Sequence, residues 1–274
     1  MDLNINSSVK LNNGVNMPIL GLGTWALSGK SAYQAVLWAL EIGYRLIDSA
    51  SLYGNEKKIG EALKATKNLR DDIFITTKVW NSDQGYDSTL AAFDRSLKLL
   101  NLDYIDLYLI HWPVKGLRDE TWKALEKIYD NGRVRAIGVS NFTIRHLDEL
   151  KATLKLIPSV NQVEFSPFLY QKELMEYCRS NKIVLEAYSP LTKAKKFSNS
   201  TLMTLGQKYS KSPAQILIRW DLQHEIVTVP KSGDKLHLID NANVFDFSLD
   251  ENDMHKLDSL NENYRTVNDP NLID

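Results

Sequence analysis

The stretch IDLYLIHWPVKGLRDETWKALEKIYDNGRVRAIGVS (105–140) contains the unit from which the rest of the chain is built. Two short apolar runs, 105–112 and 134–140, predict buried strands, and residues 119–131 between them have the spacing of an amphipathic helix. Nearly continuous apolar strands separated by helices are typical of a parallel sheet that is covered by helices.

The same alternation recurs along the whole sequence. Further strands are predicted at 18–24, 44–49, 73–79, 159–165, 183–189 and 225–230, and further helices near 31–42, 56–65, 87–100, 143–154, 170–180, 212–222 and 235–243. Eight strand–helix units predict an α/β protein with a closed (β/α)8 TIM barrel, formed by residues 1–274 as a single domain. An open doubly wound sheet is the alternative fold, although it usually has fewer units.

Residues 9–18 precede the first unit and differ from it in pattern. They read VKLNNGVNMP, with an NNG turn between two short apolar pieces. Such a turn predicts a β-hairpin. We expect this hairpin to close the bottom of the barrel, at the N-terminal ends of its strands.

The composition narrows the possible partners and locations. The formal net charge of −1 gives no reason to expect nucleic acid or an acidic membrane surface as a partner. No apolar run reaches the ~18 residues that a membrane-spanning helix requires. The single cysteine, Cys178, excludes an internal disulfide framework and fits a reducing compartment. We therefore expect a cytoplasmic protein, and we expect it to be a monomer.

Residues 21–26, GLGTWA, match the dinucleotide-binding fingerprint of a Rossmann fold, and Asp48 ends the next predicted strand. That motif requires a helix that begins inside the glycine turn, so that its N-terminus meets a pyrophosphate. Here the helical pattern begins only near Ser31. Gly21 and Gly23 are then explained by a tight turn of the backbone between the strand and its loop. The barrel therefore remains the favoured fold.

In a TIM barrel the chemistry lies at the C-terminal ends of the strands. Asp48, Lys78 and His111 lie at or next to the ends of three predicted strands, and Tyr53 is on the loop after the first of them. Each residue alone has an ordinary structural explanation, such as a helix cap, a rim aromatic, a surface lysine or a core histidine. A barrel brings all four side chains together, which favours a catalytic interpretation.

These four side chains predict a mechanism for reducing a carbonyl group. A buried lysine ammonium is costly unless it is paired, and Asp48 supplies the opposite charge for Lys78. A nearby cation favours the tyrosinate form, so we expect the pKa of Tyr53 to be lowered and its hydroxyl to act as general acid. His111 orients the substrate oxygen. The residues expected around the substrate are Trp25, Tyr53, Trp80, His111 and Trp112.

Other kinds of chemistry fit the sequence less well. The G-x-S-x-G motif, which carries the nucleophilic serine of many serine hydrolases, is absent. The five histidines lack the spacing of a zinc site, so no metal is expected. A Schiff-base aldolase could use a lysine at a strand end. However, Asp48 would keep Lys78 charged, which is the wrong state for a nucleophilic amine.

The segment VTVPKSGDKLHLIDN (227–241) follows the last strand and opens a helix. Loops at this position of a TIM barrel commonly bind phosphate, and the amides of a helix N-terminus add to such a site. Lys231 contributes a charge and Ser232 a hydroxyl. Other strand ends offer groups for a planar ring and its amide, namely Tyr188, Gln162, Ser140 and Asn141.

The chain resembles the aldo-keto reductases over essentially its whole length, in particular short-lid bacterial or archaeal members such as the 2,5-diketogluconate and glyoxal reductases. The motifs that carry this resemblance are GLGTW, GYRLIDSASLYGNE, TTKVW, LYLIHWP, GRVRAIGVSNF, NQVEFSP, AYSPL and VPKS. It implies NADPH-dependent reduction of an aldehyde or ketone, with Asp48, Tyr53, Lys78 and His111 as the catalytic residues. The implied cofactor contacts are Gly23, Thr24, Asp48, Ser140, Asn141, Gln162, Tyr188, Ser189, Leu191, Lys231, Ser232, His237 and Asn241.

The chain departs from the family pattern at three places. Ser166 replaces a histidine in VEFSP, and His237 stands where an arginine usually binds the adenosine phosphate. Because a histidine is shorter and mostly neutral at pH 7.5, we expect NADPH to be preferred by a narrower margin and some use of NADH. The short segment HWPVKGLRDETW predicts an open pocket for small carbonyls such as 2-oxoaldehydes or keto sugars. The alternative function is a regulatory barrel that binds NADP(H) with little turnover.

Overall fold

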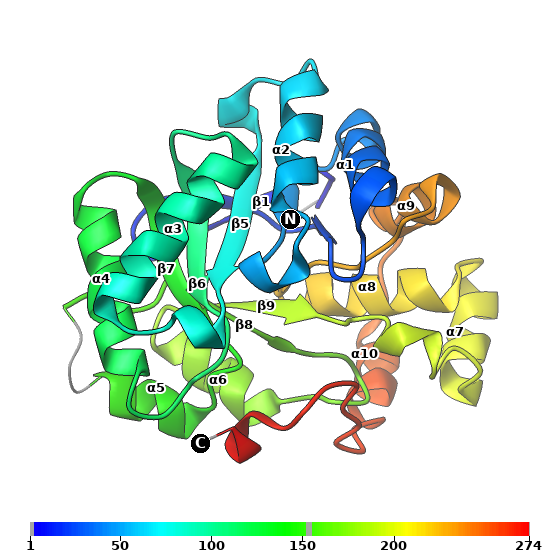
Figure 1. The fold of residues 1–274 in the computed structure, drawn as a ribbon. Coiled ribbons are helices and arrows are strands. Elements are labelled where there is room, and N and C mark those ends of the chain that lie inside the picture. Colours follow the sequence, from blue (N-terminus) through cyan, green and yellow to red (C-terminus); the bar gives the residue numbers. More distant parts are fainter. Residues whose placement is uncertain (1–2, 152–154, 274) are drawn as a thin grey trace.

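The computed structural model describes residues 3–151 and 155–273, in which parallel strands form a barrel surrounded by helices (Figure 1). An eight-stranded sheet runs in the order β10-β9-β8-β7-β6-β5-β4-β3, and every neighbouring pair in it is parallel. The strands are β3 (Gly21–Gly23), β4 (Leu46–Asp48), β5 (Phe74–Val79), β6 (Ile105–Ile110), β7 (Val134–Ser140), β8 (Val160–Glu164), β9 (Val184–Tyr188) and β10 (Val227–Thr228).

The first and last strands of the sheet meet and close the barrel. Isolated parallel bridges join Leu20 to Thr228 and Gly23 to Lys231. Gly23 permits this close approach, because a Cβ atom at its position would lie 2.6 Å from the backbone oxygen of Val229. The predicted (β/α)8 barrel is confirmed, and the open doubly wound sheet is excluded.

The helices cover the outside of the barrel, and eight of them match predicted segments. These are α1 (Gly29–Ile42), α2 (Glu56–Ala65), α3 (Tyr86–Leu100), α4 (Arg118–Asp130), α5 (Ile144–Lys151), α6 (Lys172–Ser180), α8 (Pro213–Gln223) and α9 (Lys235–Ala242). Residues 152–154, which were predicted to continue α5, lie outside the described residues. Two further helices were not predicted: α7 (Ser200–Tyr209) and α10 (Glu251–Asp258).

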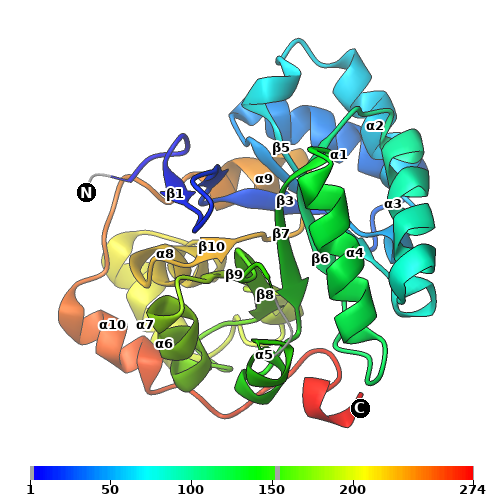
Figure 2. The same ribbon diagram turned by 90° about the vertical axis from the view of Figure 1, so that its left-hand side faces the viewer.

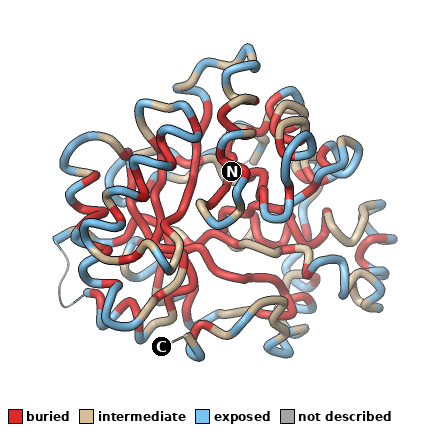
Figure 3. The backbone as a smooth tube through the Cα atoms, in the orientation of Figure 1, coloured by how far each residue is buried: buried red, intermediate tan, exposed pale blue. Residues whose placement is uncertain are grey.

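The residues of the barrel strands are mostly buried (Figure 3). Their side chains alternate between the barrel interior and the layer between strands and helices. The outward set packs under the helices in one large apolar cluster. The inward set forms a second, smaller cluster, which includes Leu46, Phe74, Leu107, Val160 and Val227. The barrel interior is therefore a packed core in its N-terminal half.

The predicted hairpin is present and plugs the N-terminal end of this core (Figure 2). Its strands β1 (Ser8–Lys10) and β2 (Asn16–Pro18) pair antiparallel. Met17 and Leu11, which are 0% and 2% exposed, belong to the inner apolar cluster. The hairpin therefore removes that end of the barrel from solvent and leaves the C-terminal end for a site.

Candidate active site

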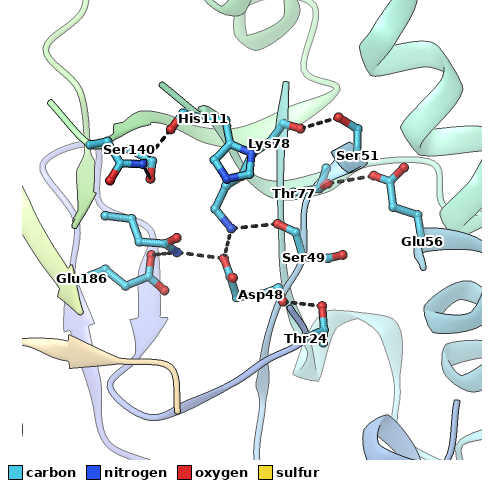
Figure 4. Close-up of polar contacts among 12 residues, drawn as sticks. Thr24, Asp48, Ser49, Ser51, Glu56, Thr77, Lys78, His111, Ser140 and Glu186 are labelled. Atoms are coloured by element: carbon cyan, nitrogen blue, oxygen red, sulfur yellow. Dashed lines mark hydrogen bonds and ion pairs between the residues drawn. The ribbon is translucent and has the colours of Figure 1, made fainter. Parts of the chain in front are cut away.

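A buried ion pair lies near the C-terminal ends of β4 and β5 (Figure 4). The ammonium of Lys78 is 2.6 Å from Oδ1 of Asp48, and it also donates to the backbone oxygen of Ser49 at 2.8 Å. Lys78 is 0% exposed. Burial lowers the pKa of Lys78, but the charges of Asp48 and Tyr53 outweigh that effect and the pKa is raised. Lys78 is therefore held in its charged state, as the sequence predicted.

Tyr53 ends the short 3-10 helix η1 (Ser51–Tyr53), which hydrogen bonds hold firmly against the barrel. The hydroxyl of Ser51 donates to the backbone oxygen of Lys78 at 3.0 Å. The buried amide of Asn55 donates to the backbone oxygens of Thr24 and Leu27 at 2.9 and 3.0 Å. The Nζ atom of Lys78 lies 5.3 Å from the centroid of the Tyr53 ring. The loop thus fixes the phenol beside the ammonium.

The pKa of Tyr53 was expected to be lowered, and this prediction is wrong. Burial raises the pKa of Tyr53, and the opposing effect of Lys78 is smaller, so the net shift is upward. Desolvation penalises the tyrosinate more than the cation stabilises it. The phenol therefore keeps its proton near neutral pH, and Lys78 favours the tyrosinate that remains once the proton has been given up.

His111 follows β6 and faces two aromatic rings across the site. Its ring centroid is 5.8 Å from that of Tyr53 and 5.1 Å from that of Trp80. Burial, together with the charge of Lys78, lowers the pKa of His111 well below its usual 6.5. The imidazole is therefore neutral, with one nitrogen able to donate and the other able to accept. Its buried Nδ1 atom has no partner among the described residues.

A cavity of about 610 Å³ opens above these residues. Most of its lining was predicted from the sequence: Gly23, Trp25, Asp48, Tyr53, Trp80, His111, Trp112, Ser140, Asn141, Gln162, Tyr188, Ser189, Leu191 and Lys231. Six other lining residues were not predicted, because none of them is a polar residue at the end of a predicted strand: Ala26, Leu52, Pro190, Lys193, Val229 and Val267. Three predicted catalytic residues, Asp48, Tyr53 and His111, line the same cavity. Lys78 is buried next to Asp48 and is not part of the lining.

Four of the predicted cofactor contacts do not line this cavity. Thr24 is buried and donates its hydroxyl to the backbone oxygen of Asp48 at 2.8 Å. Ser232 bonds with the backbone of Asp234. His237 is exposed in the first turn of α9, and Asn241 is buried on the same helix. Their roles stay predictions. Ser166, where the family usually has histidine, is buried in a turn after β8 and is also outside the lining.

Asn141 joins three strand ends into one wall of the cavity. It has a left-handed backbone, with φ of 65°. Its Nδ2 atom donates to the backbone oxygen of His111 at 2.9 Å, and its Oδ1 atom accepts from the hydroxyl of Tyr188 at 2.7 Å. Asparagine adopts this conformation more readily than other non-glycine residues, and here it directs the side-chain amide to both neighbouring strand ends.

The polar groups of this wall fit the carboxamide ring of a nicotinamide cofactor. Both Nε2–H groups of Gln162 have carboxylate acceptors at 2.8 Å, Asp48 and Glu186, so its oxygen remains to accept from a ligand amide. Ser140 adds a hydroxyl and Tyr188 a planar ring to the lining. Lys231 is exposed and adds a positive charge to the lining of the cavity.

Glu186 is a site residue that the sequence reasoning missed. It lies on β9 between Val184 and Tyr188, and all three alternate positions face the barrel interior. A glutamate at an inward position of a buried strand is the signal that could have identified it, because such a charge requires a partner.

The described residues contain neither a metal site nor a membrane-spanning helix. Within residues 3–151 and 155–273, no group of three or more histidine, cysteine, aspartate or glutamate side chains could hold a metal ion. Among those same residues, no helix has the length and apolar character needed to cross a membrane.

Comparison with known proteins identifies relatives of the whole chain. Residues 19–262 match the Aldo/keto reductase family. Glyoxal reductase of Bacillus subtilis (strain 168) is 49% identical over 274 residues, which cover 100% of this chain and 99% of that protein. The crystal structure of MGS-M4, an aldo-keto reductase from a Medee basin deep-sea metagenome library, has 49% identity and a TM-score of 0.93, over 95% of this chain and 97% of that one.

A third relative was solved with a bound cofactor. It is an aldo-keto reductase (AKR2E5) complexed with NADPH, which is 35% identical with a TM-score of 0.91 over 96% of this chain and 90% of that one. These matches confirm the predicted resemblance, and with it the predictions of an NADP-dependent oxidoreductase and of NADPH as its cofactor. The chain belongs to the aldo/keto reductase family.

Proposed function

We propose that this protein reduces small aldehydes and ketones with NADPH and that Tyr53 supplies the proton. The observation that carries this proposal is the placement of a charged Lys78, paired with Asp48 at 2.6 Å, beside a protonated Tyr53 in the wall of the cavity. A proton donor, a cation that stabilises its conjugate base and a neutral histidine are what carbonyl reduction requires.

NADPH, when bound, supplies the hydride that reaches the carbonyl carbon. The side chains of Tyr53 and neutral His111 bind the carbonyl oxygen, and Tyr53 transfers its proton to that oxygen as negative charge develops there. One hydride and one proton convert the carbonyl group into an alcohol. Lys78 stabilises the tyrosinate, which then recovers a proton from water.

The cofactor contacts that we propose for the nicotinamide lie at or near the C-terminal ends of β7, β8 and β9. Ser140, Asn141 and Gln162 face the carboxamide, and Tyr188 packs against the ring. Loops after the last strands carry Ser189, Leu191 and Lys231 toward the phosphates. We keep His237, Ser232 and Asn241 as the proposed contacts for the adenosine phosphate, since all three belong to the segment that opens α9.

Small, uncharged 2-oxoaldehydes and keto sugars are the substrates we propose. The aromatic wall of Trp25, Trp80 and Trp112, extended by Leu52 and Val267, offers apolar surface to a small organic carbonyl. Trp25 is 52% exposed, so this side of the cavity is open. The name of the Bacillus subtilis relative, glyoxal reductase, supports the 2-oxoaldehydes.

The proposal is tested by following NADPH absorbance with glyoxal, methylglyoxal, a keto sugar and a simple aromatic aldehyde, each also with NADH. We expect NADPH-dependent turnover of at least one 2-oxoaldehyde and slower turnover with NADH. Tight NADPH binding without turnover of any carbonyl would instead support a regulatory nucleotide-binding barrel.

We also infer that the protein works in the cytoplasm as a monomer. The inference rests on the single buried cysteine and on the completeness of the cavity within one chain. Light scattering coupled to size-exclusion chromatography tests the oligomeric state, and a dimeric mass would contradict a monomer.

A further inference from the structure

Glu186 is a buried carboxyl that the proposed reaction does not use. It is 0% exposed, is not among the lining residues of the cavity, and lies near Asp48 (Figure 4). Its Oε2 atom accepts a hydrogen bond from Nε2 of Gln162 at 2.8 Å. Its Oε1 atom is buried without a partner among the described residues. An unsatisfied buried carboxylate oxygen is costly, so this group calls for a functional explanation.

The charges around Glu186 do not balance if it is ionised. Asp48 and Glu186 share Gln162, but the nearby cation, Lys78, is bonded to Asp48 at 2.6 Å. The cluster is neutral only if Glu186 carries a proton. A proton on Oε1 leaves Oε2 free to accept from Gln162, which agrees with the observed bond.

Both amide hydrogens of Gln162 are therefore committed to carboxyl groups, Asp48 on one side and Glu186 on the other. The nitrogen and the oxygen of a side-chain amide point in different directions, so when the nitrogen faces the two carboxyl groups the oxygen faces away from them. Gln162 lines the cavity, so that oxygen is the group available to a ligand.

We propose that Glu186 is a positioning residue for cofactor binding, which from its protonated state fixes the carboxamide of Gln162 with the oxygen facing the cavity. This inference rests on the proposed function, because it assumes that a nicotinamide carboxamide binds there. In this role Glu186 acts through Gln162 and does not contact the substrate.

A pH effect follows from the same geometry. Burial and the charge of Asp48 raise the pKa of Glu186 to about 8, while Gln162 and Lys78 oppose the shift. Four nearby groups have pKa values shifted away from that range: those of Tyr53, Lys78 and Tyr188 are raised, and that of His111 is lowered. Asp48 is bonded to Lys78, and the residue of β10 that pairs with Glu186 is the inward-facing Val227.

Ionisation of Glu186 adds a negative charge below the ring site as the pH rises through about 8. The oxidised ring of NADP⁺ is positive, and the reduced ring of NADPH is neutral. The ratio of the NADPH dissociation constant to the NADP⁺ dissociation constant should therefore rise with pH. Both cofactors carry the same phosphates, so phosphate titration cancels in this ratio.

Two variants separate the hydrogen bond from the charge. Glu186→Leu removes the acceptor, and we expect the NADPH dissociation constant to rise roughly 3–10-fold, the effect of one hydrogen bond. Glu186→Gln keeps an oxygen that can accept from Gln162, so most of this affinity should return. It cannot ionise, so the ratio of dissociation constants should no longer change between pH 7 and 9.

Asp221, on helix α8, provides a matched control away from the cavity. It is another buried carboxyl, its pKa is raised well above the usual value by burial, one of its oxygens has no partner among the described residues, and it does not line the cavity. Asp221→Asn should leave the NADPH dissociation constant and its pH dependence unchanged. A change there as large as in Glu186→Leu would show that any buried carboxyl matters equally.

Infrared spectroscopy of the protein without cofactor gives an independent readout. The wild type should show a protonated carboxyl band that disappears between pH 7 and 9, is absent in Glu186→Gln and persists in Asp221→Asn. Wild-type NADPH affinity in Glu186→Leu, or a pH-dependent ratio in Glu186→Gln, would overturn the inference. A wild type that binds NADPH but reduces no carbonyl would overturn the proposed function alone, because the binding and infrared comparisons remain valid.

Discussion

Among the described residues of the barrel strands, two buried aspartates are paired with cations, one near each end of the barrel. Asp106, near the start of β6, accepts from Arg70 at 2.6 Å, from Arg135 at 3.1 Å and from the backbone amide of Ile75 at 2.9 Å. Asp48, at the end of β4, is bonded to Lys78 at 2.6 Å.

The two pairs differ in what surrounds them rather than in their chemistry. Both oxygens of Asp106 have charged partners, and its pKa is raised by burial against the opposing effect of Arg70. Asp48 lines the cavity, and its cation faces a phenol. We therefore expect the ion pair near the plugged end of the barrel to matter for stability alone, and we propose that the same kind of pair at the open end also serves the reaction.

The largest effect should come from Lys78→Met, which sharpens this comparison at the open end. We expect carbonyl reduction to fall roughly 10²–10⁴-fold, as when an acid–base group is lost. We also expect the free energy of unfolding to fall by about 3–5 kcal/mol, since Asp48 is left unpaired. Steady-state kinetics and urea unfolding measure the two effects. Stability unchanged in this variant would contradict a buried, charged pair.

Arg70→Met is the matched change at the other end and should affect stability alone. We expect a loss of about 3 kcal/mol, at the low end for a broken buried pair, because Arg135 still faces Asp106. Activity per folded molecule should stay within about twofold, the range expected for a site without contact to the cavity. A large loss of kcat, measured where the variant is fully folded, would break the proposed separation of the two ends.

A smaller effect, on NADPH affinity alone, is expected from adding a positive charge at position 237, near the C-terminal end of the barrel. His237→Arg should strengthen NADPH binding by roughly 1–2 kcal/mol through charged hydrogen bonds to the adenosine phosphate. His237 is exposed and its neighbour Lys235 pairs with Glu41 at 2.9 Å, so the variant adds a cation to a surface position. Fluorescence titration gives the ratio of NADPH to NADH dissociation constants. The assignment of this segment to the phosphate is wrong if that ratio is the same in both proteins.

The sequence predicted the barrel well because its strands carry a simple signal. Inward residues such as Leu46, Phe74 and Val160 are as apolar as the outward ones, which is typical of strands buried on both faces. The helices α7 and α10 were missed because they do not follow the strand–helix repeat. A prediction based on alternating strands and helices finds only the helices that belong to a strand–helix unit.

The candidate site was predicted only as far as strand ends could locate it. Polar residues at strand ends, such as Asp48 and Gln162, converge because the barrel fixes their position. Lys193 and Val267 reach the cavity on loops, whose paths depend on tertiary contacts. The upward shift in the pKa of Tyr53 could not be predicted either, because it depends on how burial and the charge of Lys78 balance.

The central claim is that Tyr53 donates the proton, and Tyr53→Phe tests it most directly. Phenylalanine keeps the ring and loses only the hydroxyl. We predict that reduction of a 2-oxoaldehyde falls roughly 10²–10⁴-fold while the NADPH dissociation constant stays near that of the wild type. Wild-type turnover by the Tyr53→Phe variant, with NADPH bound normally, would contradict the account.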